Sequence, residues 1–242
     1  MAEMDIRPTC LVIADISGYT KFIRDKQLSL LHAEQIITDL LDAVIDGAQH
    51  PLTLNKLEGD AALMYATCGE DVAATVVDVA TQIQKFFALF RERQNQLIIT
   101  GDGGCGCDAC TGTGTLQLKV IAHLGDVLIK RVRQFEELAG EPVIVVHRLL
   151  KNSVDSHEYL MMTEAFHAFT NQETGDARKE DCDGFEPQTV HVYYPETEPI
   201  VQACNLPGTK LGPHVHAYVL SARGHLSRLT KPKRTFSHLP SA

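Results

Sequence analysis

Two aspartates, Asp15 and Asp60, occupy positions from which carboxylates can be directed at a bound cation. Residues 9–14 (TCLVIA) form an apolar run rich in β-branched side chains, which predicts a buried central strand ending at Asp15. Two strand-like runs flank Glu58-Gly59-Asp60, which predicts a hairpin with Asp60 at its tip. Mg²⁺ accepts one or two carboxylates together with substrate phosphates. An aspartate in a Gly-Asp turn is also ordinary turn chemistry, so both interpretations stay open at this point.

Three cysteines, Cys105, Cys107 and Cys110, lie close together in a glycine-rich stretch, residues 100–115, which predicts a loop insertion. Thiolates at this spacing suit Zn²⁺ or an iron–sulfur cluster, and a structural zinc would hold a loop that has no apolar residues. Redox-active thiols and unliganded cysteines are the alternatives. The candidates for a fourth ligand are Cys68, Cys182, Cys204, His214 and His216.

The elements that must position these residues follow from hydrophobic periodicity. Residues 20–47 predict one long helix or two consecutive ones, and Asp71 can cap a further helix that ends before Leu97. The segment 143–151 is compatible with helix or strand. The remaining expectations are strands at 116–123, 127–133, 158–162 and 189–194, a helix at 163–169 and a loop at 171–187. This order predicts an α+β fold in which helices flank a mixed sheet.

Composition excludes some classes of function. The 242 residues are 44% hydrophobic and 22% charged, and the formal net charge of -9 disfavours a partner such as nucleic acid. The first nine residues lack the build of a secretory signal, and no stretch approaches the ~18 apolar residues of a membrane span. We therefore expect a cytoplasmic protein with no membrane partner.

Two motifs resemble those of class III adenylate and guanylate cyclases, in a divergent bacterial-type branch. Residues 15–22 (DISGYTKF) resemble the first-strand motif that carries the first metal aspartate, here Asp15. Residues 56–61 (KLEGDA) resemble the hairpin motif, in which Lys56 stands at the base-selecting position and Asp60 at the second metal position. The interval between the motifs is also similar to that of the family.

A third segment continues the resemblance. Residues 140–149 (GEPVIVVHRL) are similar to the family helix whose asparagine orients the ribose and whose arginine stabilises the pentavalent phosphorus. Arg148 falls on the arginine, whereas Ile144 stands at the asparagine position and can donate no hydrogen bond. Glu137 falls at a second base-selecting position, and residues 119–127 resemble the family's His-x-Gly-Glu/Asp element.

The resemblance covers residues 9–166 and implies a ferredoxin-like class III nucleotidyl cyclase fold. It implies a cyclase homology domain at residues 1–170 and a C-terminal extension, a strand plus an irregular tail, at residues 171–242. It also implies an attack by the ribose 3′-oxygen of a nucleoside triphosphate on the α-phosphorus, which releases diphosphate. Two Mg²⁺ or Mn²⁺ ions would be held by Asp15, Asp60 and the Ile16 carbonyl, with Arg148 meeting charge on the phosphorus.

By the same resemblance, Lys56 favours adenine, and the active form is a homodimer with two composite sites. Further nucleotide contacts are implied for Glu137, Ile16, Gly18, Tyr19 and Thr20. The departure at Ile144 leaves two hypotheses. The chain is a nucleotidyl cyclase, or it is a catalytically silent cyclase-homology domain that binds nucleotide or metal and signals through dimerisation.

Overall fold

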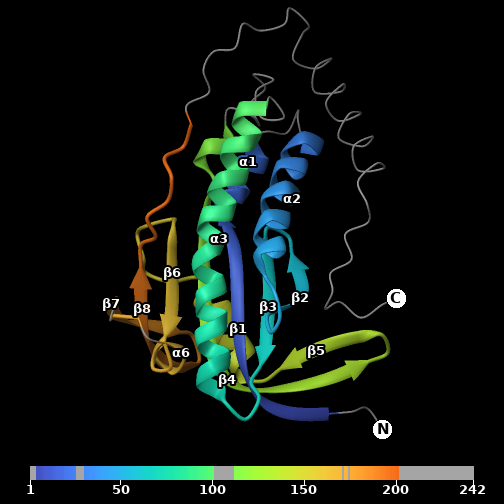
Figure 1. Cartoon of the computed structure of the whole chain (residues 1–242), viewed down its shortest axis with the longest axis vertical. Coiled ribbons are helices and arrows are strands. Elements are labelled where there is room, and N and C mark those ends of the chain that lie inside the picture. Colours follow the sequence, from blue (N-terminus) through green and yellow to red (C-terminus); the bar gives the residue numbers. More distant parts are fainter. Residues whose placement is uncertain (1–3, 26–29, 101–111, 171, 174, 202–242) are drawn as a thin grey trace, which may run out of the picture.

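The computed structural model describes residues 4–25, 30–100, 112–170, 172–173 and 175–201 (Figure 1). Its strands are β1 (Met4–Ser17), β2 (Thr53–Glu58), β3 (Ala61–Thr67), β4 (Gln117–Val132), β5 (Phe135–Ala139), β6 (Tyr159–Thr163), β7 (Asp176–Cys182) and β8 (Phe185–Tyr193). Its helices are α1 (Tyr19–Asp25), α2 (Leu30–Gly47), α3 (Val72–Thr100), α5 (Glu141–Arg148) and α6 (Glu164–His167), with a 3₁₀ turn at Thr113–Thr115. This is the α+β arrangement that the sequence predicts.

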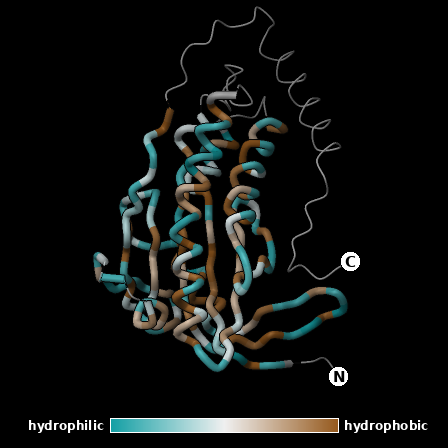
Figure 2. Tube along the Cα trace, viewed as in Figure 1, coloured by the Kyte–Doolittle hydropathy of each residue, from teal (hydrophilic) through white to brown (hydrophobic). Residues whose placement is uncertain are grey.

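The strands form one sheet in the order β2-β3-β1-β4-β6-β8-β7, and β5 pairs with the outer part of β4. Most pairs are antiparallel, whereas β4 and β6 are parallel, so the sheet is mixed as expected. The β4–β5 hairpin extends away from the body of the molecule (Figure 1). The hydrophobic colouring is strongest along β1, and the outer end of this hairpin is largely hydrophilic (Figure 2).

Alternation along β1 divides the interior into two clusters, one on each face of the sheet. Val12 and Ala14 face α2 and α3, and they pack in one cluster with residues such as Phe86. Leu11 and Ile13 point to the opposite face and pack with residues of α5 such as Val145. We call these the α2/α3 face and the α5 face. Asp15 continues the second series and therefore belongs to the α5 face.

The helix α5 forms although Val-Ile-Val-Val alone favours a strand. Pro142 lies in its first turn, where the missing N–H costs no hydrogen bond, and Val145, Val146 and Leu149 are buried against the sheet. Gly125 of β4 permits this packing, because a Cβ there would lie 2.5 Å from Pro142 Cγ. Tertiary packing therefore overrides local propensity at this point.

Several elements differ from the sequence predictions. The two strands expected at 116–123 and 127–133 are one strand, β4, because it pairs without interruption with the whole of β1. Asp71 caps α3 as predicted, with its Oδ1 accepting from the Ala74 N–H at 2.9 Å, but α3 runs past Leu97. The turn after β4 leads into β5, a strand that the pattern did not reveal.

The loop expected at 171–187 instead contains β7 and the start of β8. These two strands belong to the same sheet as the preceding elements, although residues 171–242 were expected to lie outside the cyclase homology domain. Residues 202–242 of that extension lie outside the described part of the chain.

Helix α3 meets a length-and-composition criterion for a membrane span over Val72–Ile98, with a mean hydropathy of 1.2. Its apolar side chains Val76, Ile83, Phe86 and Phe90 are fully buried in the core of this domain. The apolar character of α3 is therefore explained by its packing on the sheet.

Candidate functional site

The structure brings Asp15 and Asp60 to the same edge of the α5 face. Asp15 lies near the end of β1, directly opposite Ala61 in β3. Asp60 occupies the turn between β2 and β3, and its carbonyl accepts a hydrogen bond from the Ile16 N–H at 3.1 Å. Because the turn is tied to the end of β1 in this way, the two aspartates are held next to each other.

The electrostatics of this pair favour a cation. Desolvation and then the nearby charge of Asp15 raise the pKa of Asp60 to about 6. Among the described residues, Lys119 forms an ion pair with Asp15, and its Nζ lies 3.1 Å from Asp15 Oδ2. The ammonium also donates to the Leu150 carbonyl at 3.4 Å. Two adjacent, half-buried carboxylates with one neighbouring ammonium fit a divalent cation such as Mg²⁺ or Mn²⁺.

The residues that follow Asp15 lie beside this edge. Gly18 adopts a φ of +92°, which favours glycine, and its carbonyl accepts from the Phe22 N–H at 2.9 Å in the first turn of α1. Tyr19 and Thr20 begin α1, and the Tyr19 hydroxyl donates to Glu34 Oε1 at 3.0 Å. The charge of Asp60 is among the influences that raise the pKa of Tyr19, after desolvation and Glu34, so these groups share one region.

Lys56 is held by a second group of charges on the α5 face. Its Nζ lies 2.9 Å from Glu58 Oε1, and Glu58 Oε2 lies 2.9 Å from His147 Nε2. The other ring nitrogen of His147 lies 2.6 Å from the Val143 carbonyl. Both ring nitrogens therefore face oxygen atoms, which hold the ring between Val143 and Glu58. Desolvation raises the pKa of Glu58, but Lys56 and His147 together lower it below its ordinary value.

Glu137 and its neighbour Glu136 point to opposite faces of β5. Glu137 is exposed and lies opposite Lys130 of β4. Glu136 reaches the β2–β3 hairpin, where its carboxylate accepts from the Tyr65 hydroxyl and its carbonyl accepts from Asn55 Nδ2 at 3.1 Å. The side chain that β5 directs toward the hairpin of Lys56 is thus Glu136.

Arg148 lies at the end of α5 and forms an ion pair with Asp183. Its Nη1 donates to Asp183 Oδ2 at 2.5 Å, in the turn between β7 and β8. Ile144 is 44% exposed on the same helix. Asn152, another amide near this helix, donates from its Nδ2 to Tyr159 Oη at 2.7 Å and to the Leu149 carbonyl at 2.6 Å.

One chain therefore gathers Asp15, Asp60, Ile16 and the residues 18–20, and keeps Lys56 and Arg148 in separate ion pairs. Cys105, Cys107 and Cys110 lie outside the described residues. Sequence reasoning did not single out Lys119, Glu58 or Glu136. Lys119 lies in a strand that the pattern predicts, but only the pairing of β4 with β1 brings it opposite Asp15.

Comparison with known proteins gives a family of sequences and a class of folds. The family described as "Protein of unknown function (DUF2652)" matches residues 37–159. The uncharacterized protein Rv2561/Rv2562 of Mycobacterium tuberculosis is 41% identical over 128 residues, which cover 53% of this chain and 57% of that protein. The chain thus spans little more than half the length of this relative.

Among solved structures, the adenylyl cyclase CyaB from P. aeruginosa matches with a TM-score of 0.60 and 11% identity, over 83% of this chain and 100% of that one. The guanylyl cyclase Cya2 matches with a TM-score of 0.61 and 14% identity, over 79% and 93%. A class III adenylyl cyclase-like ATP-binding protein from Pseudomonas aeruginosa matches with a TM-score of 0.55 and 16% identity, over 70% and 36%.

At these identities the structural matches establish the fold. They cover 100% and 93% of the two cyclase chains, so the likeness extends over nearly the whole of each catalytic domain. The chain therefore belongs to the DUF2652 family, and its fold is that of the class III adenylyl and guanylyl cyclase catalytic domains.

Proposed function

We propose that this chain is a nucleotidyl cyclase that converts a nucleoside triphosphate, with ATP favoured, into a 3′,5′-cyclic nucleotide and diphosphate. The observation that carries the proposal is the pair Asp15 and Asp60, held at one edge of the sheet by the hydrogen bond from the Ile16 N–H to Asp60. Their mutual repulsion and partial burial favour a divalent cation, which is what a triphosphate brings to a site.

Each residue has a definite part in this reaction. Asp15, Asp60 and the Ile16 carbonyl would hold Mg²⁺ or Mn²⁺, which supplies Lewis-acid activation of the ribose 3′-oxygen and neutralises phosphate charge. The 3′-hydroxyl would lose its proton to water and its oxygen would bond to the α-phosphorus, while the bond from that phosphorus to the oxygen bridging the β-phosphate breaks and diphosphate leaves. Arg148 would meet negative charge on the phosphorus, a role for which a guanidinium is suited because it donates in a planar fork.

Lys56 would donate to a ring nitrogen of the base, and this favours adenine because the corresponding ring nitrogen of guanine carries a hydrogen and needs an acceptor. In the chain without nucleotide, Glu58 Oε1 pairs with the Lys56 ammonium, and Glu58 Oε2 contacts His147. Glu136, and not Glu137, is directed toward the same hairpin and could add an acceptor for an exocyclic amine. The choice of base would therefore depend on how Lys56 separates from Glu58 to contact the base.

The distribution of these residues supports a homodimer. Arg148 and Lys56 form ion pairs with Asp183 and Glu58, and Asp15 pairs with Lys119. Two copies related by a twofold axis would each bring an Arg148 and a Lys56 to the aspartates of the other copy, which gives two composite sites.

A second candidate function, a silent domain that binds nucleotide, is favoured by two observations. The ammonium of Lys119 already compensates Asp15, and Ile144 offers no hydrogen bond where the cyclase helix has an asparagine. One protein of similar fold is a class III adenylyl cyclase-like ATP-binding protein. In this alternative the chain binds the nucleotide at the same site but does not convert it.

The deciding assay incubates the purified chain with Mn²⁺ or Mg²⁺ and each of ATP, GTP, CTP and UTP, and detects cyclic product by mass spectrometry. We expect product from ATP, and its loss in Asp60→Ala. The Lys56→Glu variant should shift base choice, because it replaces a donor with an acceptor. Nucleotide binding without product would favour the silent domain, and full activity in Asp60→Ala would refute the cation assignment.

A mixing experiment tests the composite site. Asp60→Ala and Arg148→Ala are each expected to be inactive, but a mixed dimer has one intact site, formed by Asp60 of one copy and Arg148 of the other. At equal concentrations, about a quarter of the wild-type activity should return on mixing. If each copy contained a whole site, mixing would restore nothing.

A further inference from the structure

Two histidines and a glutamate gather on the α2/α3 face, at the opposite side of the sheet from Asp15. Glu164 and His167 are three residues apart in α6 and therefore lie on one side of that helical turn. His191 is in β8, where it pairs with Met162, just before β6 leads into α6. Residues far apart in the sequence, 164–167 and 191, are thus brought together by the β6–β8 ladder. Figure 1 shows α6 next to β8 at this end of the sheet.

The donor atoms of these side chains lie close to one another. One donor atom from each residue lies within 4.8 Å of the others. His191 Nε2 is 2.6 Å from Glu164 Oε2, and the rings of His167 and His191 stack with centroids 3.9 Å apart. His167 also lies against the ring of Tyr193, at a centroid distance of 6.2 Å, which limits its rotation.

The hydrogen bonds of this group are incomplete. His167 Nε2 and His191 Nδ1 are buried and have no hydrogen-bond partner among the described residues. His191 is only 5% exposed, so water does not replace the missing partner freely. Buried polar atoms are nearly always paired, and an unpaired buried imidazole nitrogen needs a proton donor, an acceptor or a metal ion.

We propose that Glu164, His167 and His191 bind a divalent transition-metal ion, with Zn²⁺ as the ion of best fit. Two imidazoles and one carboxylate form a ligand set that suits Zn²⁺, whereas Mg²⁺ prefers oxygen ligands alone. The exposed side of Glu164 gives the ion a path to the site, and His191 supplies a ligand that packing fixes. Three protein ligands leave a fourth position open to water or to a ligand from outside.

This site is independent of the proposed cyclase reaction. His191 belongs to the face opposite Val190 and Val192, which pack in the cluster of the α5 face. Asp15 and Asp60 are oxygen ligands on that other face. The two sites therefore differ in place and in the ions that they prefer.

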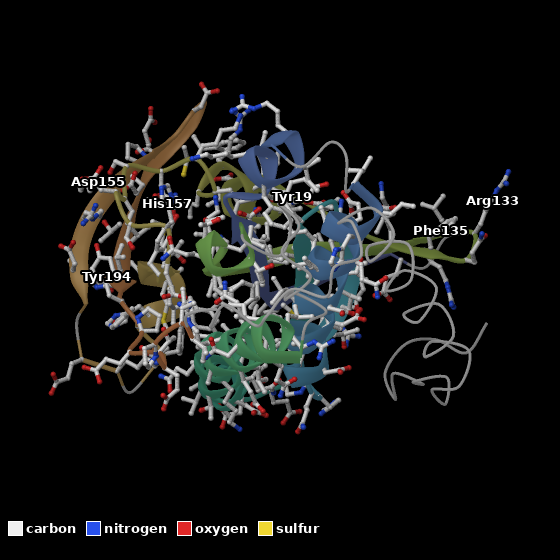
Figure 3. The ribbon with its side chains drawn as sticks, turned by 90° about the horizontal axis from the view of Figure 1, so that it is seen from above. Tyr19, Arg133, Phe135, Asp155, His157 and Tyr194 are labelled. Carbon is white, nitrogen blue, oxygen red and sulfur yellow. The ribbon has the colours of Figure 1, made fainter. Side chains whose placement is uncertain are left out.

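The test uses the full chain carrying Cys105→Ser, Cys107→Ser and Cys110→Ser, so that the cysteine-rich segment does not compete. Zn²⁺ is titrated against a chromophoric chelator. One tight equivalent is expected, lost in His167→Ala and weakened at least about tenfold in Glu164→Gln. Glu164 is exposed, so its replacement by glutamine should leave the circular dichroism spectrum unchanged. His157→Ala removes an exposed histidine elsewhere, labelled in Figure 3, and should bind Zn²⁺ normally.

Co²⁺ gives a second readout. In the same background, its visible absorption should show nitrogen and oxygen ligands without thiolate charge-transfer bands, and the signal should vanish in His167→Ala. The proposal is overturned if no tight equivalent binds, if Glu164→Gln and His167→Ala bind as tightly as the parent, or if thiolate bands appear.

Discussion

At the scale of single residues, the charge on Asp60 is sensitive to pH. Its pKa in the folded chain is about 6, above the ordinary value of 3.8, mainly because of desolvation and then because of Asp15. Between these two values the folded chain binds more protons than the unfolded chain. The contribution of Asp60 to stability is therefore fully present below pH ~4 and is lost as the pH rises through ~6.

We predict that the Asp60→Asn variant does not show this loss of stability as the pH rises. In EDTA, the free energy of unfolding of the variant should exceed that of the wild type by more at pH 7 than at pH 4. The gain should be well below ~1.4 kcal/mol per unit of pKa shift, because Asp60 is only partly buried and water screens its charge. Urea unfolding at both pH values measures it, and an equal difference at the two values would contradict the assignment.

Lys119 is a second residue whose role can be isolated. Its ammonium lies 3.1 Å from Asp15 Oδ2 and so competes with any cation for that carboxylate. We predict that Lys119→Met, which keeps the apolar stem, raises Mn²⁺ affinity by about tenfold. Electron paramagnetic resonance of free Mn²⁺ measures the affinity. Lys85→Met, at an exposed position in α3, is the matched control and should change nothing. Unchanged or weaker binding in Lys119→Met would show that the ammonium supports the cation site.

At the scale of elements, the packing of α5 on β4 determines the positions of several residues of the candidate site. The helix carries His147 and Arg148, and it is followed by the Leu150 carbonyl that accepts from Lys119. Its approach to the sheet depends on Gly125, where a Cβ would lie 2.5 and 2.9 Å from atoms of Pro142. A side chain at this position must displace the helix.

We predict that Gly125→Ala destabilises the chain by about 1–3 kcal/mol through overpacking and also lowers nucleotide affinity. Gly69→Ala is the control, since a Cβ at that position meets no atom within 4 Å. Pro142→Ala in the Gly125→Ala background should recover part of the loss, because the two side chains compete for one space. Thermal unfolding of the wild type, Gly125→Ala, Pro142→Ala and the double variant measures the coupling, and strict additivity would contradict this account.

Hydrophobic periodicity and helix caps in the sequence predict the elements whose buried side chains are apolar. They locate β1, the β2–β3 hairpin, α2 and the start of α3. They fail for β7, a polar edge strand whose Glu180 is buried because its carboxylate accepts from the Ser153 N–H and Oγ at 3.0 and 2.6 Å. Backbone pairing with β8 and these hydrogen bonds replace an apolar pattern there.

The candidate site shows the same limit. Asp15 and Asp60 can be predicted because short motifs at the ends of strands fix their positions. The choice between Glu136 and Glu137 cannot, since a shift of one residue in register exchanges the two faces of β5. Lys119 meets Asp15 only through the long-range pairing of β4 with β1, which no local pattern encodes.

At the scale of the whole molecule, the β4–β5 hairpin carries apolar side chains into solvent. Phe135 is 59% exposed and Val132 is 49% exposed. Figure 3 shows Phe135 and Arg133 at the outer end of this hairpin, away from the body. An aromatic side chain presented in this way is the kind of residue that dominates interfaces, and the proposed homodimer gives it a partner surface.

We predict that Phe135→Glu weakens dimerisation by at least tenfold, because it places a charge where an apolar contact is expected. Light scattering after size exclusion, over a range of concentrations, measures the shift toward monomer. Leu31→Glu is the matched control, since Leu31 is 79% exposed on α2 and should leave the dimer intact. The same Phe135→Glu change should remove the activity recovered by mixing Asp60→Ala with Arg148→Ala, yet leave Mn²⁺ binding to Asp15 and Asp60 unchanged. A variant that stays dimeric and still complements would exclude the hairpin from the interface, whereas loss of Mn²⁺ binding as well would mean that the cation site itself needs both copies.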